Sequence, residues 1–122
     1  MAESPTVVLL SVDLMMTSTV SAAAAQSRLN FRTATGPKQL SPWADEDLII
    51  IDLATPGLRI SEAAAAVTDR QKQTAIVYGP HVHTDRFEQA RDAGFKHLLA
   101  RGRFNAEAGQ IILDFAGADR AV

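Results

Sequence analysis

The sequence contains no cysteine among its 122 residues. This absence excludes disulfide bonds, zinc sites built on thiolates and catalysis by a cysteine nucleophile. Positive charge is not in excess either, because 12 Lys and Arg stand against 14 Asp and Glu, which gives a formal net charge of -2. Nucleic-acid binding needs a basic surface that neutralises phosphates. We therefore expect no direct contact with nucleic acid.

Long apolar runs are also missing. No stretch approaches the ~20 apolar residues that a membrane span requires. The apolar segment 7–10 and the alanines at 22–25 superficially resemble a secretory signal, but Glu3 and Asp13 are acidic and no Lys or Arg precedes Arg28. We expect a cytoplasmic protein without membrane contact, built as a single domain over residues 1–122.

Short apolar segments recur along the chain at the spacing of buried strands. The segment 48–52 (LIIID) is the strongest of them, because its continuous apolar character is typical of a central parallel strand covered by helices on both faces. The strands that we predict span residues 7–11, 31–34, 48–52, 74–78 and 96–100.

Alanine-rich and capped segments between these strands predict helices. The predicted helices run from a cap at Thr17 or Ser18 to Leu29, from Ser61 through residues 62–70, from a cap at Thr84 to Asp92 or Ala93, and from a cap at Asn105 toward Phe115, with Gly117 ending the last one. A further helical segment after Gly36 and Pro37 should be interrupted by Pro42. Gly94 suits the left-handed position at a helix end.

This alternation predicts an α/β fold with three αβα layers, a five-stranded parallel sheet and right-handed crossovers. In such folds, ligands bind at the carboxyl ends of the strands, near the point where the strand order reverses. That rule selects four places in the sequence, which are residues 11–13, 52–55, 78–83 and 100–103.

Two of these places carry family motifs. The segment IIIDLATPGL (residues 49–58) resembles the third strand of bacterial response-regulator receiver domains, in which a phosphoaccepting Asp is followed by Leu, two variable residues and Pro-Gly. The segment DAGFKHLLARGRF (residues 92–104) resembles the end of their fourth helix, their fifth strand and the following loop. The resemblance covers nearly the whole chain. It implies the flavodoxin-like (βα)5 fold of receivers, with strand order 2-1-3-4-5, and a role in two-component signalling.

The resemblance places the phosphoacceptor at Asp52. Receivers hold Mg²⁺ with adjacent acids after the first strand, and the matching residues here are Ser11 and Val12, with Asp13 one place later. A hard cation needs several oxygen ligands in near-octahedral order. We therefore expect no metal site and no cofactor.

The remaining receiver positions are also altered. Gly79 stands where receivers have the Thr or Ser that contacts the phosphoryl group, and Leu98 stands where they have an aromatic residue. Arg101 matches their lysine and Gly102 matches the proline that follows it. This is the pattern of a degenerate receiver, or pseudo-receiver, and we expect Arg101 to pair with Asp52.

Two further features have ordinary structural interpretations. His81 and His83 lie in a predicted loop and His97 near a strand, and a solvated loop is favoured over a metal site because no acidic ligand accompanies them. Trp43 is interpreted as a packing residue or loop anchor, or as a partner contact if it is exposed. No nucleophile has a clear base beside it, so we do not expect an enzyme.

The function that we predict is a signalling or protein-interaction module without Mg²⁺-dependent phosphotransfer. By resemblance, its protein partner or second copy binds residues 85–115, the fourth helix, fifth strand and fifth helix. The exposed candidates on this surface are Phe87, Arg91, Lys96 and Arg103.

Two alternatives remain. One is an active receiver phosphorylated on Asp52, with a displaced Mg²⁺ site that uses Asp13. The other is a sensor of a small anion or ligand, which would bind in the strand-end pocket beside Asp52. The residues predicted to line that pocket are Ser11, Asp13, Thr55, Gly79 and Arg101.

Overall fold

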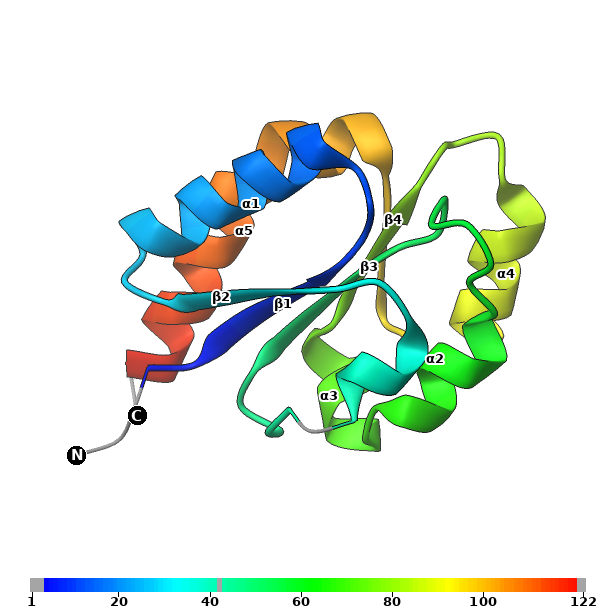
Figure 1. Cartoon of the computed structure of the whole chain (residues 1–122), viewed down its shortest axis with the longest axis horizontal. Coiled ribbons are helices and arrows are strands. Elements are labelled where there is room, and N and C mark those ends of the chain that lie inside the picture. The colour runs from blue at the N-terminus through cyan, green and yellow to red at the C-terminus, as the bar shows by residue number, and fades with distance from the viewer. Residues whose placement is uncertain (1–3, 42, 121–122) are drawn as a thin grey trace.

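A single parallel sheet forms the centre of the molecule (Figure 1). The computed structural model describes residues 4–41 and 43–120. The sheet has five strands in the order β2-β1-β3-β4-β5, as predicted. The strands are β1 (Thr6–Leu10), β2 (Asn30–Ala34), β3 (Leu48–Asp52), β4 (Ile76–Gly79) and β5 (His97–Ala100).

Helices cover both faces of the sheet and complete the predicted three layers. Figure 1 shows α1 and α5 side by side on one face, with α2, α3 and α4 on the other. The bounds are α1 (Leu14–Gln26), α2 (Ile60–Ala66), α3 (Asp69–Thr74), α4 (Thr84–Asp92) and α5 (Arg101–Arg120), and a short 3-10 helix, η1, spans Pro37–Leu40. None of the helices within the described ranges is long and apolar enough to cross a membrane.

The central strand β3 has the predicted bounds, and all five of its residues are buried. Because side chains alternate along a strand, Ile50 packs in the core under α1 and α5, while Ile49 and Ile51 pack in the core under the other helices. Burying each such side chain contributes roughly 1.5–3 kcal/mol. The two cores hold β3 from both faces and bring Asp52 to its carboxyl end.

The first helix begins earlier than predicted. Asp13, and not Thr17 or Ser18, is its N-cap, because the Asp13 carboxylate accepts hydrogen bonds from the backbone N–H groups of Met15 and Met16. The helix ends at Gln26, before the predicted end at Leu29. Arg28, just beyond the helix, adopts a left-handed φ of 60°.

Two more helix predictions were wrong. The predicted helix from Ser61 to residue 70 is interrupted, because Val67 is extended and Thr68 forms a capping box with Gln71 that starts α3. The last helix begins at Arg101, so Asn105 and Gly117 lie inside it. Its buried residues recur every fourth position and hold it against the sheet: Phe104, Ala108, Ile112 and Ala116.

The fourth helix follows the prediction more closely. It spans Thr84–Asp92, and its N-cap is His83, one residue before the predicted cap Thr84. His83 makes no side-chain capping bond. Gly94 adopts a φ of +104°, the left-handed conformation expected of it. The segment after Gly36 forms η1, and Pro42, predicted to interrupt it, lies outside the described residues.

Candidate functional site at the carboxyl ends of the strands

Three polar side chains lie on the same face of the sheet at the ends of neighbouring strands. Leu9, Ile50 and Ile76 pack in the core under α1 and α5. Because side chains alternate, the residues two positions later face the same way, and these are Ser11, Asp52 and Tyr78. All three are buried.

Both carboxylate oxygens of Asp52 accept hydrogen bonds from the chain itself. The Ser11 hydroxyl donates to Oδ2 at 2.7 Å, and the backbone N–H of Ala54 donates to Oδ1 at 2.9 Å. Asp52 is 5% exposed. A buried carboxylate needs such donors, because burying it without partners costs several kcal/mol.

Ser11 joins Asp52 to the turn between β1 and α1. Its hydroxyl oxygen also accepts a hydrogen bond from the backbone N–H of Asp13 at 3.0 Å. Asp13 Oδ1 in turn accepts from Met15 and Met16, at 3.0 and 3.2 Å. The start of α1 and the end of β3 are therefore connected through one serine hydroxyl.

Arg101 pairs with Asp13, and the predicted pairing with Asp52 was wrong. Its Nη2 donates a short hydrogen bond to Asp13 Oδ2. The packing of α1 against α5 explains this choice, because Asp13 caps α1 and Arg101 is the first residue of α5. This hydrogen bond lowers the pKa of Asp13 below its ordinary value, although partial burial opposes the shift, and it raises the pKa of Arg101.

Thr55 and Gly79, the other two residues of the predicted pocket, have different surroundings. The Thr55 hydroxyl lies 3.5 Å from the backbone oxygen of Leu10 and ties the loop after β3 to β1. Gly79 faces Leu53, and a Cβ atom at Gly79 would lie 3.0 Å from the Cβ of Leu53. Ser11, Asp13, Asp52 and Arg101 thus form one chain of hydrogen bonds. The Thr55 side chain takes no part in it, although the Thr55 backbone N–H donates to the backbone oxygen of Asp52 at 3.1 Å.

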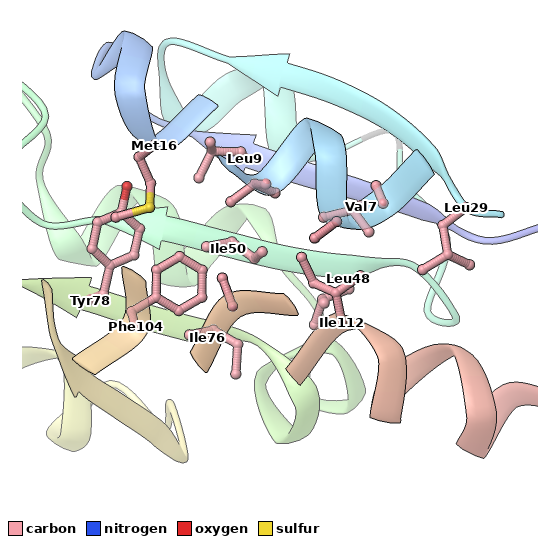
Figure 2. Close-up of a cluster of buried hydrophobic side chains, with 14 of the residues drawn as sticks. Val7, Leu9, Met16, Leu29, Leu48, Ile50, Ile76, Tyr78, Phe104 and Ile112 are labelled. Atoms are coloured by element: carbon pink, nitrogen blue, oxygen red, sulfur yellow. The ribbon is translucent and has the colours of Figure 1, made fainter. Parts of the chain in front are cut away.

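Tyr78 is a site residue that was not predicted from the sequence. Its ring is fully buried and stacks on Phe104, with 4.6 Å between ring centroids and 14° between ring planes (Figure 2). Its hydroxyl has no hydrogen-bond partner among the described residues. Burial raises the pKa of Tyr78; the nearby Ser11 hydroxyl lowers it, and the charge of Asp52 raises it further. The period-two spacing from Ile76 could have identified this position.

The side chains of this site are poorly arranged for Mg²⁺. Within residues 4–41 and 43–120, no three His, Asp or Glu side chains gather in a way that could hold a metal ion. A cation held by Asp13 and Asp52 would compete with the guanidinium of Arg101 for Asp13 and with the hydroxyl of Ser11 for Asp52. The donor set therefore does not fit Mg²⁺ in this arrangement.

The histidines and Trp43 lie away from this site. His81 and His83 are exposed, and Nε2 of His97 lies 2.9 Å from the backbone oxygen of Gln73. Trp43 is half-buried, and its indole N–H donates to the backbone oxygen of Gln39 at 2.7 Å. These contacts match the loop-anchor interpretation of Trp43.

The predicted partner surface lies on α4, β5 and α5. Arg91, Lys96 and Arg103 are exposed, whereas Phe87 is half-buried and packs against the core under α4. Arg103 pairs with Glu107 one turn later, at 2.8 Å. A shallow hollow between α4 and β5 is lined by Phe87, Arg91, Leu98 and Ala100, together with His81.

Comparison with known proteins identifies the fold. No family model matches the chain, and no curated protein is similar to it in sequence. The receiver domain of a sensor histidine kinase from Pseudomonas aeruginosa, solved with magnesium in its active-site cleft, is similar in structure, with a TM-score of 0.69, 16% identity and coverage of 94% of this chain and 99% of that one. The chain has the receiver fold.

Other solved receivers agree. A response regulator from Hahella chejuensis has a TM-score of 0.68 at 18% identity, with 93% of each chain covered. The beryllofluoride-activated NtrC4 receiver domain, a dimer in solution, has a TM-score of 0.63 at 17% identity, with 90% of this chain and 98% of that chain covered. At these identities the similarity concerns the fold.

Proposed function

We propose that this receiver-fold domain is a signalling module that acts through contacts with another protein, without Mg²⁺-dependent phosphotransfer. One observation carries the proposal. All four carboxylate oxygens of Asp13 and Asp52 already accept hydrogen bonds from the chain, and one of the donors is the guanidinium of Arg101. In this proposal the domain works in the cytoplasm, with no enzymatic turnover, no cofactor and no contact with nucleic acid.

The reasoning rests on what a metal ion needs. Mg²⁺ keeps near-octahedral order and binds through carboxylates together with phosphate oxygens. At this site the guanidinium of Arg101 forms an ion pair with Asp13. Val12, which stands where receivers have an acid, has no side-chain oxygen that could bind a metal ion. Metal binding would compete with the Arg101–Asp13 ion pair and with the Ser11–Asp52 hydrogen bond.

The test is adduct formation with beryllofluoride, followed by fluorine NMR with and without Mg²⁺. We expect no adduct on the wild-type chain and none on Asp52→Asn. The variant Val12→Asp/Arg101→Lys supplies a second acid and a lysine, so it should form the adduct in the presence of Mg²⁺. This variant serves as the positive control for the assay. An adduct on the wild-type chain that Asp52→Asn abolishes would refute the proposal.

The alternative of an active receiver has one observation in its favour. Asp13 and Asp52 border the same serine, since Ser11 donates to Asp52 and accepts from the Asp13 N–H. Under this alternative, Arg101→Gln would release Asp13 toward a metal ion. Mg²⁺ binding that appears in Arg101→Gln and disappears in Arg101→Gln/Asp13→Asn would support a displaced metal site.

A small-anion sensor is the third candidate, but the cation that would bind the anion already forms an ion pair within the chain. The guanidinium of Arg101, which would hold an anion, donates to Asp13. An anion must therefore displace a carboxylate that is held by the N-cap geometry of α1. Phosphate titrated into the wild-type chain should leave the thermal midpoint unchanged, whereas a concentration-dependent rise that Arg101→Gln removes would favour the sensor.

For the contact surface we propose the α4–β5–α5 face. The exposed cations Arg91 and Lys96 lie on it, and the receiver domain of NtrC4, which has the same fold, is a dimer. Sedimentation velocity over a range of concentrations tests whether a second copy binds there. We expect Arg91→Glu/Lys96→Glu to weaken self-association, while the matched variant Arg32→Glu/Arg70→Glu, which changes exposed cations elsewhere, leaves it unchanged. The opposite pattern would place the interface outside this face.

A further inference from the structure

Tyr78 carries the unpartnered hydroxyl of the strand-end site. The side chain is fully buried, and no described residue offers its hydroxyl a hydrogen bond of acceptable geometry. Buried polar groups without partners are rare in folded proteins, because the lost hydrogen bonds to water are not replaced. Such a group needs an explanation from its surroundings.

The surroundings of the hydroxyl contain a candidate partner. Tyr78 and Asp52 are register partners on adjacent parallel strands, and both face α1 and α5. Ser11, Asp52 and Asp13 all influence the Tyr78 hydroxyl, and of these Ser11 and Asp52 also act through the hydrogen-bonding groups of their side chains. In the structure the Ser11 hydroxyl donates a hydrogen bond to Oδ2 of Asp52 at 2.7 Å. Ser11 is therefore bonded to the carboxylate oxygen of the neighbouring strand, and Tyr78 is the second hydroxyl beside that carboxylate.

We propose that Tyr78 is the second hydrogen-bond donor to Asp52 and takes over its carboxylate when the Ser11 hydroxyl leaves it. The site then has two arrangements. In one, Ser11 bonds Asp52 and ties it to the β1–α1 turn through the Asp13 N–H. In the other, Tyr78 bonds Asp52 and the turn is released, while the carboxylate keeps two donors because Ala54 remains in place.

The exchange has a path to the partner surface. The Tyr78 ring stacks on Phe104, which lies in the first turn of α5 (Figure 2). A shift of the phenol toward Asp52 moves one ring of this stack. Because close-packed interiors transmit strain, the choice of donor at Asp52 changes the packing under α5. Tyr78 acts through Asp52 and Phe104, so it is a positioning residue.

The experiment exploits a feature of the composition: Tyr78 is the single tyrosine of the chain. Tyrosine labelled with carbon-13 at Cζ therefore gives one resonance, which moves toward the phenolate position when the hydroxyl donates to a carboxylate. We expect this resonance to move in Ser11→Ala, where Oδ2 is free, and to return in Ser11→Ala/Asp52→Ala. A resonance that stays in place in Ser11→Ala, or that stays displaced after Asp52 is removed, would overturn the proposal.

Unfolding equilibria supply a second measurement. In the wild-type background Tyr78→Phe removes an unpartnered hydroxyl and should change the unfolding constant by less than about twofold. In the Ser11→Ala background it removes a bond to a charged group and should raise that constant about tenfold. The control background is Thr19→Ala, which loses a hydroxyl bonded within α1 and should behave like wild type. An equal effect of Tyr78→Phe in all three backgrounds would contradict the inference. Neither measurement uses phosphorylation, so their outcome is separate from that of the adduct test.

Discussion

Arg101 donates a hydrogen bond to the carboxylate of Asp13, 88 residues earlier in the chain. The pair joins the first residue of α5 to the N-cap of α1, and it lies at the edge where β1 and β5 end. Asp13 therefore has two roles, because one oxygen caps a helix while the other accepts a bond from a cation. Replacing its side chain in two ways can separate these roles.

Asp13→Ala should lower the free energy of unfolding by about 1–2 kcal/mol, because it removes the helix cap and the ion pair together. Asp13→Asn keeps an oxygen that can cap α1 and loses only the charge, so it should cost about 0.5–1 kcal/mol. Urea denaturation of both variants measures the difference. Equal losses would show that the cap does not contribute to stability.

Low pH should reduce the stability of the fold through the protonation of Asp13. The pKa of Asp13 is lowered from its ordinary value of 3.8, chiefly by the hydrogen bond from Arg101. A carboxyl group with a lowered pKa in the folded state contributes stability above its unfolded pKa, and this contribution is lost as pH falls through the folded pKa. The stability difference between wild type and Asp13→Asn should therefore be full at about pH 6 and shrink below about pH 4. A difference that stays constant down to about pH 2 would contradict this assignment.

Alkaline pH should act through Tyr78. Burial raises the pKa of this phenol above its ordinary value of 10.0. A group whose pKa is raised in the folded state contributes stability that is fully present below the unfolded pKa and is lost as pH rises through the folded pKa. Phenolate absorbance should therefore appear only as the protein unfolds, well above about pH 10. Because the chain has one tyrosine, a phenolate band that titrates near its ordinary pKa in folded protein would refute the burial argument.

A hydroxyl restored at position 79 should not fit. In Gly79→Ser the new Cβ would lie 3.0 Å from the Cβ of Leu53, so we expect a loss of about 1–3 kcal/mol from overpacking. Thermal unfolding measures the loss. It should fall only in part when Gly79→Ser is introduced into a Leu53→Ala background, because alanine removes the Leu53 Cδ1 at 3.3 Å but keeps the Cβ at 3.0 Å. Gly36→Ser is the control, since no atom lies within 4 Å of a Cβ built there. Equal stability of both serine variants would show that the space at Gly79 is not limiting.

The break between α2 and α3 depends on one buried amide. The Gln71 side chain accepts from the Thr68 N–H and donates to the backbone oxygens of Trp43 and Ala44, and it is 1% exposed. Gln71→Ala should lower the free energy of unfolding by about 2–3 kcal/mol, because it removes three part-buried hydrogen bonds made by one buried side chain. Gln73→Ala, at an exposed position of the same helix, should cost less than about 0.5 kcal/mol. Similar losses in chemical denaturation would contradict this account of the break.

The failed helix predictions share a cause. Asn105 favours helix starts and Gly117 favours helix ends when only local preference counts. In the structure both lie inside α5, because Phe104, Ala108, Ile112 and Ala116 bury one side of this helix along its length. Tertiary burial outweighs a local preference that amounts to about 1 kcal/mol or less per residue. Their spacing of four residues was visible in the sequence.

Four residues of the site could be selected from the sequence, but their hydrogen-bond partners could not. Ser11, Asp13, Asp52 and Arg101 were all selected from the sequence, because each lies where a parallel strand ends and such ends meet at one edge of the sheet. Their pairing was not predictable in this way. Asp13 caps α1, and α1 packs beside α5, so Arg101 reaches Asp13 while Asp52 stays bonded to Ser11. The hydroxyl of Tyr78 was overlooked because its partners become apparent only from packing.

The sequence by itself determined the layers of this protein and the edge where polar groups gather, because strand and helix periodicities and strand ends are local features. The order of the strands came with the family resemblance and is the order observed. Only the tertiary structure decided which side chain holds which. Hydrogen bonds and ion pairs depend on distances of a few ångströms between residues far apart in the chain, and these distances follow from how α1, α5 and the sheet pack together.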